Sequence, residues 1–158
     1  YRRLVETVAL WDVAAERQVQ IAGPDAARLV QMLVPRDISK MRVGQGRYAL
    51  LSDVTGKLIN DPVLLKLADD RYWFSIADSD IEYWVGGVAT ALDLEVEVTE
   101  PDVSPLAIQG PNAPLVMADL FGDWVRELKY FACRESELDG DPLLAPRERE
   151  LVPILSQL

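Results

Sequence analysis

The sequence predicts an α+β fold built from two related halves. Three observations support this prediction: segments in which apolar and polar residues alternate as they do in strands, segments in which apolar residues recur at helical spacing, and one strand–Gly-Pro–helix unit that occurs twice. With 158 residues, of which 49% are hydrophobic and 27% charged, the chain has the size of one domain with its own core or of half of a larger one.

The first strand–helix unit lies near the start of the chain. Residues 18–21 alternate polar and apolar side chains, which predicts a strand, and Gly23 and Pro24 end it. Between residues 26 and 33 the apolar side chains fall on one helical face, and Pro35 stops the pattern. A helix is therefore expected there.

A meander of three strands is expected next. Residues 47–52 and 57–67 indicate two strands joined by a turn at 53–56, and the aromatic segment 72–76 predicts a third strand. The apolar residues between positions 81 and 92 then recur at helical spacing, so an amphipathic helix should follow the meander.

After a further strand at 94–98, the opening unit recurs. Residues 108–113 (Ile-Gln-Gly-Pro-Asn-Ala) match residues 21–26 (Ile-Ala-Gly-Pro-Asp-Ala) at an offset of 87, and three apolar positions of the following helix match at the same offset. We interpret this as duplication of one unit, since chance punctuation by Gly-Pro explains fewer matched positions. A last strand is expected at 128–133.

Asp61 stands out within the predicted strand 57–67. Side chains of a strand alternate between its faces, so Asp61 shares one face with aliphatic residues such as Ile59 and Val63. A carboxylate buried without partners is costly, so we expect a hydrogen bond or a neutralising group near it. Pro62 cannot donate to a sheet and indicates an edge, a bulge or a ligand. The residues alone leave a structural acid and a ligand-binding acid equally open.

Tyr48, Asp61 and Ser75 form the polar constellation of most interest. If residues 47–76 form a meander, their polar atoms can converge on one surface among aliphatic neighbours. A mostly apolar pocket with a few fixed polar groups suits a planar heteroaromatic ligand. A half-buried core position for Tyr48 stays open as the alternative.

Composition argues against several classes of function. The chain has no His, which removes Ser-His-Asp triads, Cys-His dyads and imidazole metal sites. Its one cysteine, Cys133, cannot form an intrachain disulfide and is expected to be a buried, unreactive thiol, which fits a reducing cytoplasm. The net charge of −10 argues against nucleic acid and anionic membranes, and the glycines at 44 and 46 do not complete a dinucleotide fingerprint.

Five motifs occur in an order that resembles a known family. They are Trp11-Asp12-Val13, the Gly-Pro unit at 23–26, the segments 44–50 and 56–61, and the segment 106–111. Together they resemble the tetrahydrofolate-dependent aminomethyltransferase family, typified by the T-protein of the glycine cleavage system. The resemblance implies ferredoxin-like repeats of the T-protein folate-binding type, truncated in the second repeat.

Within that family, the sequence is more similar to dimethylsulfoniopropionate demethylases than to T-proteins. T-proteins usually continue the Asp-Val step with Ser-His-Met and carry paired Asp residues in the strand, whereas this chain has Ala14-Ala15-Glu16 and Asn60-Asp61. The segments 75–80 and 100–111 also resemble the demethylases, and Ala14 is a departure from their usual Ser.

The resemblance implies a site for tetrahydrofolate as co-substrate. Asp61 matches the family's acid beside the reactive edge of the pterin and is the expected catalytic residue. Tyr48 and Val63 match pocket-wall positions, and Tyr130 lies where family aromatics approach the folate. Ser75 is expected on the substrate side. The implied reaction passes a methyl group from dimethylsulfoniopropionate to N5 of tetrahydrofolate; aminomethyl transfer in glycine cleavage and a non-catalytic folate-binding assembly role stay open as alternatives.

Three segments are expected along the chain: an N-terminal folate-binding subdomain at 1–102, the start of a second repeat at 103–145, and a divergent tail at 146–158. The family's pterin-gripping glutamates belong to a motif that does not follow residue 145 here, so the chain is expected to be partial and inactive by itself. The expected partners are tetrahydrofolate and a small methyl donor in the cytoplasm, with a homodimer left open and no metal, nucleic acid or membrane expected.

Overall fold

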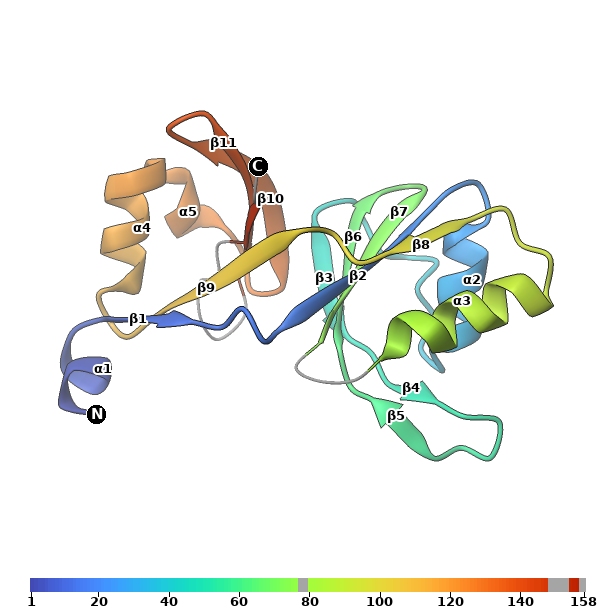
Figure 1. Cartoon of the computed structure of the whole chain (residues 1–158). Helices are drawn as coiled ribbons and strands as arrows, with labels where there is room; N and C mark the ends of the chain where they lie inside the picture. Colours follow the sequence, from blue (N-terminus) through green and yellow to red (C-terminus); the bar gives the residue numbers. More distant parts are fainter. Residues whose placement is uncertain (77–79, 148–153, 157–158) are drawn as a thin grey trace. The chain divides into compact units, whose positions relative to one another are not determined.

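The computed structural model describes residues 1–76, 80–147 and 154–156, and the chain divides into two compact units (Figure 1). Unit 2 comprises residues 15–101, and unit 1 comprises residues 1–14 together with residues 102–158. The change of unit near residue 102 is where the sequence places the start of its second repeat. Residues 1–14, which the sequence groups with the first segment, lie in the unit of the second repeat.

Unit 2 is an antiparallel sheet with two helices. Its elements are β2 (Arg17–Ala22), α2 (Ala26–Leu33), β3 (Gln45–Tyr48), β4 (Leu51–Ser52), β5 (Leu58–Asn60), β6 (Val63–Ala68), β7 (Arg71–Ile76), α3 (Ile81–Ala91) and β8 (Glu97–Thr99). The strand order is β3-β6-β7-β2-β8, and β4 pairs with β5 in a separate hairpin. The order β6-β7-β2-β8 with two crossing helices is that of the ferredoxin-like β-α-β-β-α-β fold, as the family resemblance implied.

Helices α2 and α3 cover one face of this sheet (Figure 1). The alternation in β2 directs Val19 and Ile21 toward the helices, where they pack with the helical residues Leu29 and Val30. Full burial of such a side chain contributes about 1.5–3 kcal/mol, so this apolar layer holds helix and sheet together. The predicted strand at 18–21 and helix at 26–33 are therefore confirmed.

The strand predicted over residues 57–67 is interrupted in the structure. β5 ends at Asn60 and pairs with β4, whereas β6 begins at Val63 and pairs with β3. Pro62 lies at this interruption, which suits a residue that has no N–H to donate to a neighbouring strand. Its carbonyl oxygen still accepts a hydrogen bond from the amide of Ala49 at 2.9 Å. The predicted strand 47–52 is divided in the same way, into β3 and β4.

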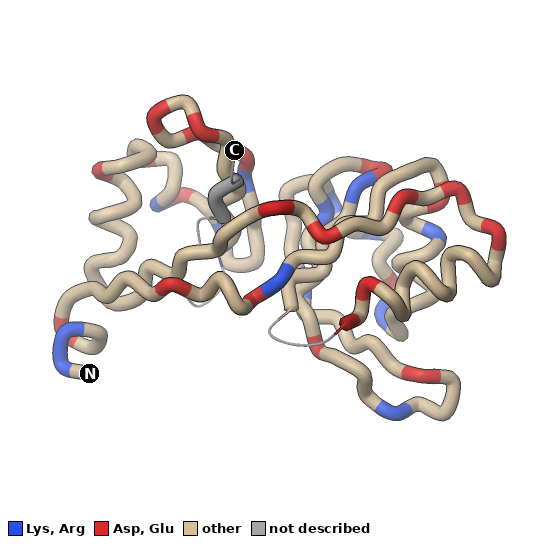
Figure 2. The backbone as a smooth tube through the Cα atoms, viewed as in Figure 1, with Lys and Arg blue, Asp and Glu red and all other residues tan. Residues whose placement is uncertain are grey.

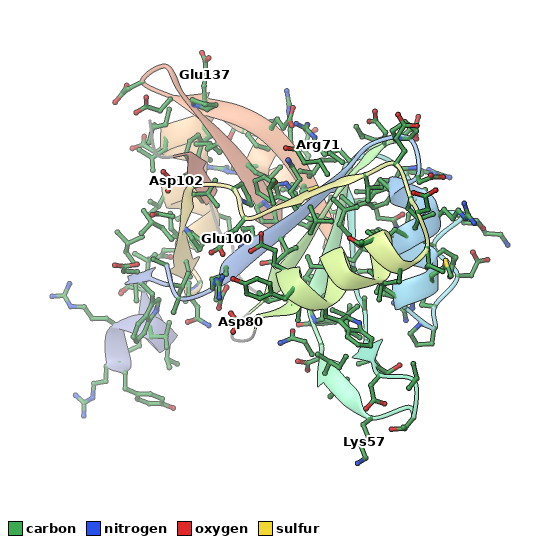
Figure 3. The ribbon with its side chains drawn as sticks, turned by 45° about the vertical axis from the view of Figure 1, so that its right-hand side comes forward. Lys57, Arg71, Asp80, Glu100, Asp102 and Glu137 are labelled. Carbon is green, nitrogen blue, oxygen red and sulfur yellow. The ribbon has the colours of Figure 1, made fainter. Side chains whose placement is uncertain are left out.

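The hairpin turn between β4 and β5 is built on Asp53. One carboxylate oxygen of Asp53 accepts hydrogen bonds from the amide of Thr55 at 2.8 Å, the hydroxyl of Thr55 at 2.7 Å and the amide of Lys57 at 3.0 Å. These bonds lower the pKa of Asp53, with the Thr55 side chain contributing most. Gly56 supplies the positive φ of +83°, and the side chain of Lys57 extends away from the hairpin (Figure 3). The predicted turn at 53–56 is confirmed.

Unit 1 is a second antiparallel sheet with helices. Its elements are α1 (Arg2–Glu6), β1 (Ala9–Asp12), β9 (Val103–Gln109), α4 (Ala113–Phe121), α5 (Trp124–Glu127), β10 (Ala132–Leu138), β11 (Asp141–Arg147) and β12 (Ile154–Ser156). Within this unit the strands follow the order β1-β9-β12-β11-β10. The strand predicted at 128–133 begins only at Ala132. Within the segment expected to be a divergent tail, residues 154–156 form β12, which pairs with both β11 and β9.

The two Gly-Pro units make the same close backbone contact. Gly23 has a φ of +132°, and a Cβ there would lie 2.6 Å from the carbonyl oxygen of Glu95. Gly110 has a φ of +125°, and a Cβ there would lie 2.6 Å from the carbonyl oxygen of Thr7. Any other residue would therefore combine a strained backbone with a steric clash at either position.

The equivalence of Thr7 and Glu95 explains why residues 1–14 belong to unit 1. The amide of Asp25 donates to the Glu95 carbonyl at 3.3 Å, and the amide of Asn112 donates to the Thr7 carbonyl at 2.9 Å. Just after these carbonyls, β8 pairs with β2, and β1 pairs with β9. The N-terminal strand thus supplies to unit 1 the edge strand that β8 supplies to unit 2.

Acidic and basic residues are interspersed along both units (Figure 2). No helix in the described part of the chain is long and apolar enough to cross a membrane. Among residues 1–76, 80–147 and 154–156, no three Cys, Asp or Glu side chains are grouped as metal ligands would be.

Candidate functional site

Three of the five predicted site residues lie in one row across the sheet of unit 2. Tyr48 of β3 is in register with Val63 of β6, and Val63 is in register with Ser75 of β7. Directly opposed residues of antiparallel strands share a face, with Cβ atoms about 4.5–5.5 Å apart. Their neighbours Leu64 and Phe74 belong to the core beneath the helices, so the row lies on the opposite face of the sheet.

The row combines an apolar centre with hydroxyl groups on either side. Val63 is 6% exposed, whereas Ser75 is partly exposed and Tyr48 is 51% exposed. The phenol ring of Tyr48 adds a large flat surface with a polar end. This arrangement offers an apolar contact for a planar ligand together with hydroxyl groups that can fix its orientation.

Asp61 lies beside the row, at the interruption between β5 and β6. It is exposed, so the expectation of a carboxylate buried on an aliphatic strand face is wrong. The neighbouring Pro62 is buried instead, and Val63 of the row follows it directly. Because Asp61 is outside both strands and hydrated, its carboxylate avoids the desolvation cost and is accessible to a ligand. The catalytic role of Asp61 stays a prediction.

Tyr130 belongs to the other unit, in the turn before β10. It is 55% exposed, and its ring meets the ring of Phe131 edge to face with 4.4 Å between centroids. Phe131 has a φ of +56°, a conformation that bulky residues rarely adopt, and its amide donates to the carbonyl oxygen of Arg147. These contacts fix the turn that presents Tyr130, whose folate contact stays a prediction.

Cys133 is buried in unit 1, as the sequence predicted. Burial raises the pKa of its thiol to about 12, and the nearby carboxylate of Glu135 acts in the same direction. A thiol with so high a pKa carries almost no thiolate at neutral pH. Cys133 is therefore unsuited to act as a nucleophile.

An ion-pair network lies where β2 begins. The guanidinium of Arg17 donates from Nε to Oε1 of Glu100 at 2.8 Å and from Nη1 to Oδ1 of Asp80 at 3.1 Å. A second bond joins Arg17 to Glu100. Figure 3 shows Asp80 just before α3 and Glu100 just after β8. The hydrogen bonds to Glu100 and Asp80 raise the pKa of Arg17, and the hydrogen bond from Arg17 lowers the pKa of Glu100. Both groups therefore stay charged at neutral pH.

Two hollows on unit 2 lie apart from the row. One of about 390 Å³ lies between the end of α2, the β4–β5 hairpin and α3, and Trp84 and Val54 line it. The other, of about 460 Å³, lies beside Gly23 and Glu95. Neither hollow is lined by a predicted site residue, so neither adds evidence for the predicted ligand.

A family comparison identifies the chain. The model of the GCVT N-terminal domain matches residues 1–148. The chain belongs to the GCVT N-terminal domain family. This assignment confirms the resemblance to the aminomethyltransferase family that the ordered motifs indicated.

Individual relatives of this family differ in their named activities. Over 144 residues the chain is 46% identical to the dimethylsulfoniopropionate demethylase DmdA of Ruegeria pomeroyi, a match that covers 91% of this chain and 40% of the relative. It is 30% identical to a probable aminomethyltransferase of Pyrococcus abyssi, covering 89% of this chain and 37% of the relative. The chain therefore spans about 40% of the length of these curated relatives.

Two solved structures share the fold of this chain. The glycine cleavage system aminomethyltransferase T from Bartonella henselae superposes with a TM-score of 0.83 at 23% identity, over 98% of this chain and 43% of that one. A heterotetrameric sarcosine oxidase from Corynebacterium sp. U-96 superposes with a TM-score of 0.66, also at 23% identity, over 94% of this chain and 74% of that one. These likenesses establish the T-protein type of fold.

One further residue of the row in this GCVT N-terminal domain is not indicated by the sequence. Gln18 of β2 is in register with Ser75 and so extends the row to a fourth strand. It is 1% exposed, although its position in the alternating segment 18–21 predicts only the polar face of a strand. Alternation shows which face a residue occupies and does not show whether that face is covered, so the sequence held no signal for the burial of Gln18.

Proposed function

We propose that this member of the GCVT N-terminal domain family takes part in tetrahydrofolate-dependent methyl transfer. The proposal rests mainly on the row of Tyr48, Val63 and Ser75, with Asp61 beside it. The three residues of the row, which are separate in the sequence, lie on one face of the sheet of unit 2. The 46% identity to a dimethylsulfoniopropionate demethylase supports the same reading.

Within this proposal, the methyl donor is dimethylsulfoniopropionate. Its sulfonium methyl is already activated, because the sulfur leaves as a neutral thioether. In the transfer the C–S bond breaks with its electron pair going to sulfur, a bond forms between the methyl carbon and N5 of tetrahydrofolate, and N5 gives up its proton to water. The protein then has mainly to align the two reactants and exclude water.

Asp61 orients the folate and offsets the positive charge that passes from sulfur to nitrogen. Its exposure supports this role, because a hydrated carboxylate at a break between strands is accessible to a ligand. Tyr48 and Val63 provide the wall, and Ser75 faces the methyl donor.

The first test is binding of tetrahydrofolate to the chain itself. We expect the melting temperature to rise with tetrahydrofolate concentration, and Asp61→Asn to weaken binding by about tenfold, which corresponds to about 1.4 kcal/mol. Asp70→Asn is the matched control, because it removes one exposed carboxylate from the same unit at a distance from the row. Equal dissociation constants for wild type and Asp61→Asn would contradict the role of Asp61.

The second test measures transfer in a longer protein. The chain would replace the corresponding 40% of the Ruegeria pomeroyi demethylase, and the product 5-methyltetrahydrofolate would be followed by mass spectrometry. We expect turnover with dimethylsulfoniopropionate and a loss of at least tenfold on Asp61→Asn. Unchanged turnover in the variant would remove Asp61 from the mechanism.

Aminomethyl transfer is the second candidate, because relatives named as aminomethyltransferases match the chain at about 30% identity. The residues Ala14-Ala15-Glu16, where T-proteins usually carry Ser-His-Met, count against it. The longer protein distinguishes the two, since activity in glycine cleavage without demethylation would favour aminomethyl transfer. Binding of tetrahydrofolate without either activity would favour an assembly role.

A further inference from the structure

The row on unit 2 ends at a buried amide. Gln18 lies directly across from Ser75, which lies across from Val63, which lies across from Tyr48, so the four residues cross β2, β7, β6 and β3 on one face. Gln18 is 1% exposed and is the fully buried polar side chain of this row. The row therefore runs from the exposed phenol of Tyr48 to an enclosed carboxamide.

The carboxamide of Gln18 is satisfied on one side only. Its Nε2 donates to the carbonyl oxygen of Glu16 at 3.1 Å, which fixes the orientation of the amide. Its Oε1 is buried and accepts no hydrogen bond. A buried acceptor without a donor destabilises the folded state, because it has lost its hydrogen bonds to water and gained none in the protein. The fold thus tolerates an unfavourable group at this position.

Gln20 shows that the same strand can satisfy such an oxygen. Gln20 lies two residues further along β2 on the same face, and its Oε1 accepts a hydrogen bond from Nε1 of Trp73 at 2.9 Å. Both residues carry the same carboxamide, but Gln20 lies across from Trp73, which has a ring N–H to donate, and Gln18 lies across from Ser75. Only Gln18, in the row of Ser75, Val63 and Tyr48, is left with an open acceptor.

We propose that Gln18 is a ligand-selecting residue of the tetrahydrofolate site, and that its Oε1 accepts a hydrogen bond from an N–H group of bound tetrahydrofolate. This inference rests on the proposed function. An amide oxygen only accepts, so its partner must carry a donor. Dimethylsulfoniopropionate has no N–H group and, as a carboxylate, no O–H group, whereas the pterin ring of tetrahydrofolate carries several N–H groups.

The enclosure of Oε1 makes binding depend on a local shift. Ser75, directly across the strand pair, is partly exposed and marks the side from which a ligand reaches Gln18. A ligand N–H that reaches Oε1 gives this oxygen a hydrogen bond that it lacks in the free protein, so the full free energy of that bond favours binding. The buried oxygen of Gln18 therefore lowers the stability of the ligand-free fold and strengthens the binding of a ligand that carries a donor.

The experiment compares Gln18→Met with wild type in the complete chain. Methionine has nearly the same length and lacks the oxygen. We expect the ligand-free variant to melt at the same temperature as wild type or higher, because the unsatisfied oxygen is gone. We expect its dissociation constant for tetrahydrofolate, from calorimetric titration, to rise about tenfold, the effect of one neutral hydrogen bond.

Gln20→Met is the matched control. It removes the acceptor of Trp73, so we expect a lower melting temperature without ligand and an unchanged dissociation constant for tetrahydrofolate. Gln18→Met is thus expected to weaken binding without loss of stability, and Gln20→Met to lower stability without weaker binding. A general effect of altering β2 would change both quantities in both variants.

The outcomes separate this inference from the function on which it rests. If wild type binds tetrahydrofolate and Gln18→Met binds it with the same dissociation constant, the role of Gln18 is overturned and the proposed function stands. If ligand-free Gln18→Met is clearly less stable than wild type, Oε1 has a structural partner and the inference is also overturned. If wild type does not bind tetrahydrofolate, the proposed function fails and Gln18 with it.

Discussion

Arg17 joins three elements of unit 2 at the residue scale. Its planar guanidinium contacts Glu100 after β8 and Asp80 before α3 while its own backbone begins β2. A bidentate pair between guanidinium and carboxylate holds its geometry better than a lysine pair does. The network therefore fixes the end of the sheet next to Gln18 and Ser75.

This pair should make stability depend on pH in a defined direction. Arg17 lowers the pKa of Glu100 below its ordinary value of 4.5. Because the folded pKa is the lower one, the stabilisation is present above pH 4.5 and is lost as the pH falls through the folded pKa. We expect Glu100→Gln to lower the melting temperature by about 1–3 °C at pH 7 and by less at pH 3.

The control for this prediction is the pair of Arg126 and Asp123, three residues apart on the surface of unit 1. Asp123 is 85% exposed, so Asp123→Asn should leave the melting temperature nearly unchanged at both pH values. A pH-independent effect of Glu100→Gln would show that the side chain acts by packing and not by charge.

At the scale of elements, Gly23 allows the turn between β2 and α2 to lie directly against the segment before β8. We expect Gly23→Ala to cost about 2–4 kcal/mol, because the methyl group would lie 2.6 Å from the Glu95 carbonyl oxygen at a φ that alanine disfavours. Urea denaturation followed by circular dichroism measures the change in the free energy of unfolding.

Gly86 provides the matched substitution. It lies inside α3 and a Cβ there would meet nothing within 4 Å. We expect Gly86→Ala to stabilise the chain by about 0.5–1 kcal/mol, since alanine is the better helix former. Equal destabilisation by both substitutions would refute the special role of the Gly23 contact.

The break at Asp61 and Pro62 is the second feature that belongs to the scale of elements. Aliphatic side chains on both sides of the break made residues 57–67 read as one strand. In the structure these residues form two strands, because β5 pairs with β4 whereas β6 pairs with β3. Periodicity records the preference of each residue for a strand and carries no information about which strand is its neighbour.

At the scale of the whole molecule, residues 1–12 complete unit 1 from the far end of the chain. Their removal should expose the edge of β9 that pairs with β1. It should also remove the Thr7 carbonyl against which Gly110 packs. In hydrogen–deuterium exchange by mass spectrometry, we expect amides of residues 103–109 to exchange at least tenfold faster, with β2 in unit 2 unchanged. Equal acceleration in both segments would contradict the division into two units.

Much of the fold was accessible to local reasoning. The helix at 26–33, the turn at 53–56 and the duplicated Gly-Pro unit were all predicted, because each depends on side-chain spacing or on the conformational freedom of glycine near its own position. The strand pattern and the family resemblance also indicate Tyr48, Val63 and Ser75, which the structure holds in one row.

The amino-acid sequence by itself determined the family, the α+β repeats and three residues of the row, Tyr48, Val63 and Ser75, because these depend on residue order and on local preference. Tertiary structure alone decided that Asp61 is exposed, that residues 1–14 join the second repeat, and that Gln18 is enclosed with an open acceptor. Burial and strand pairing depend on segments far apart in the chain, so no local pattern carries them.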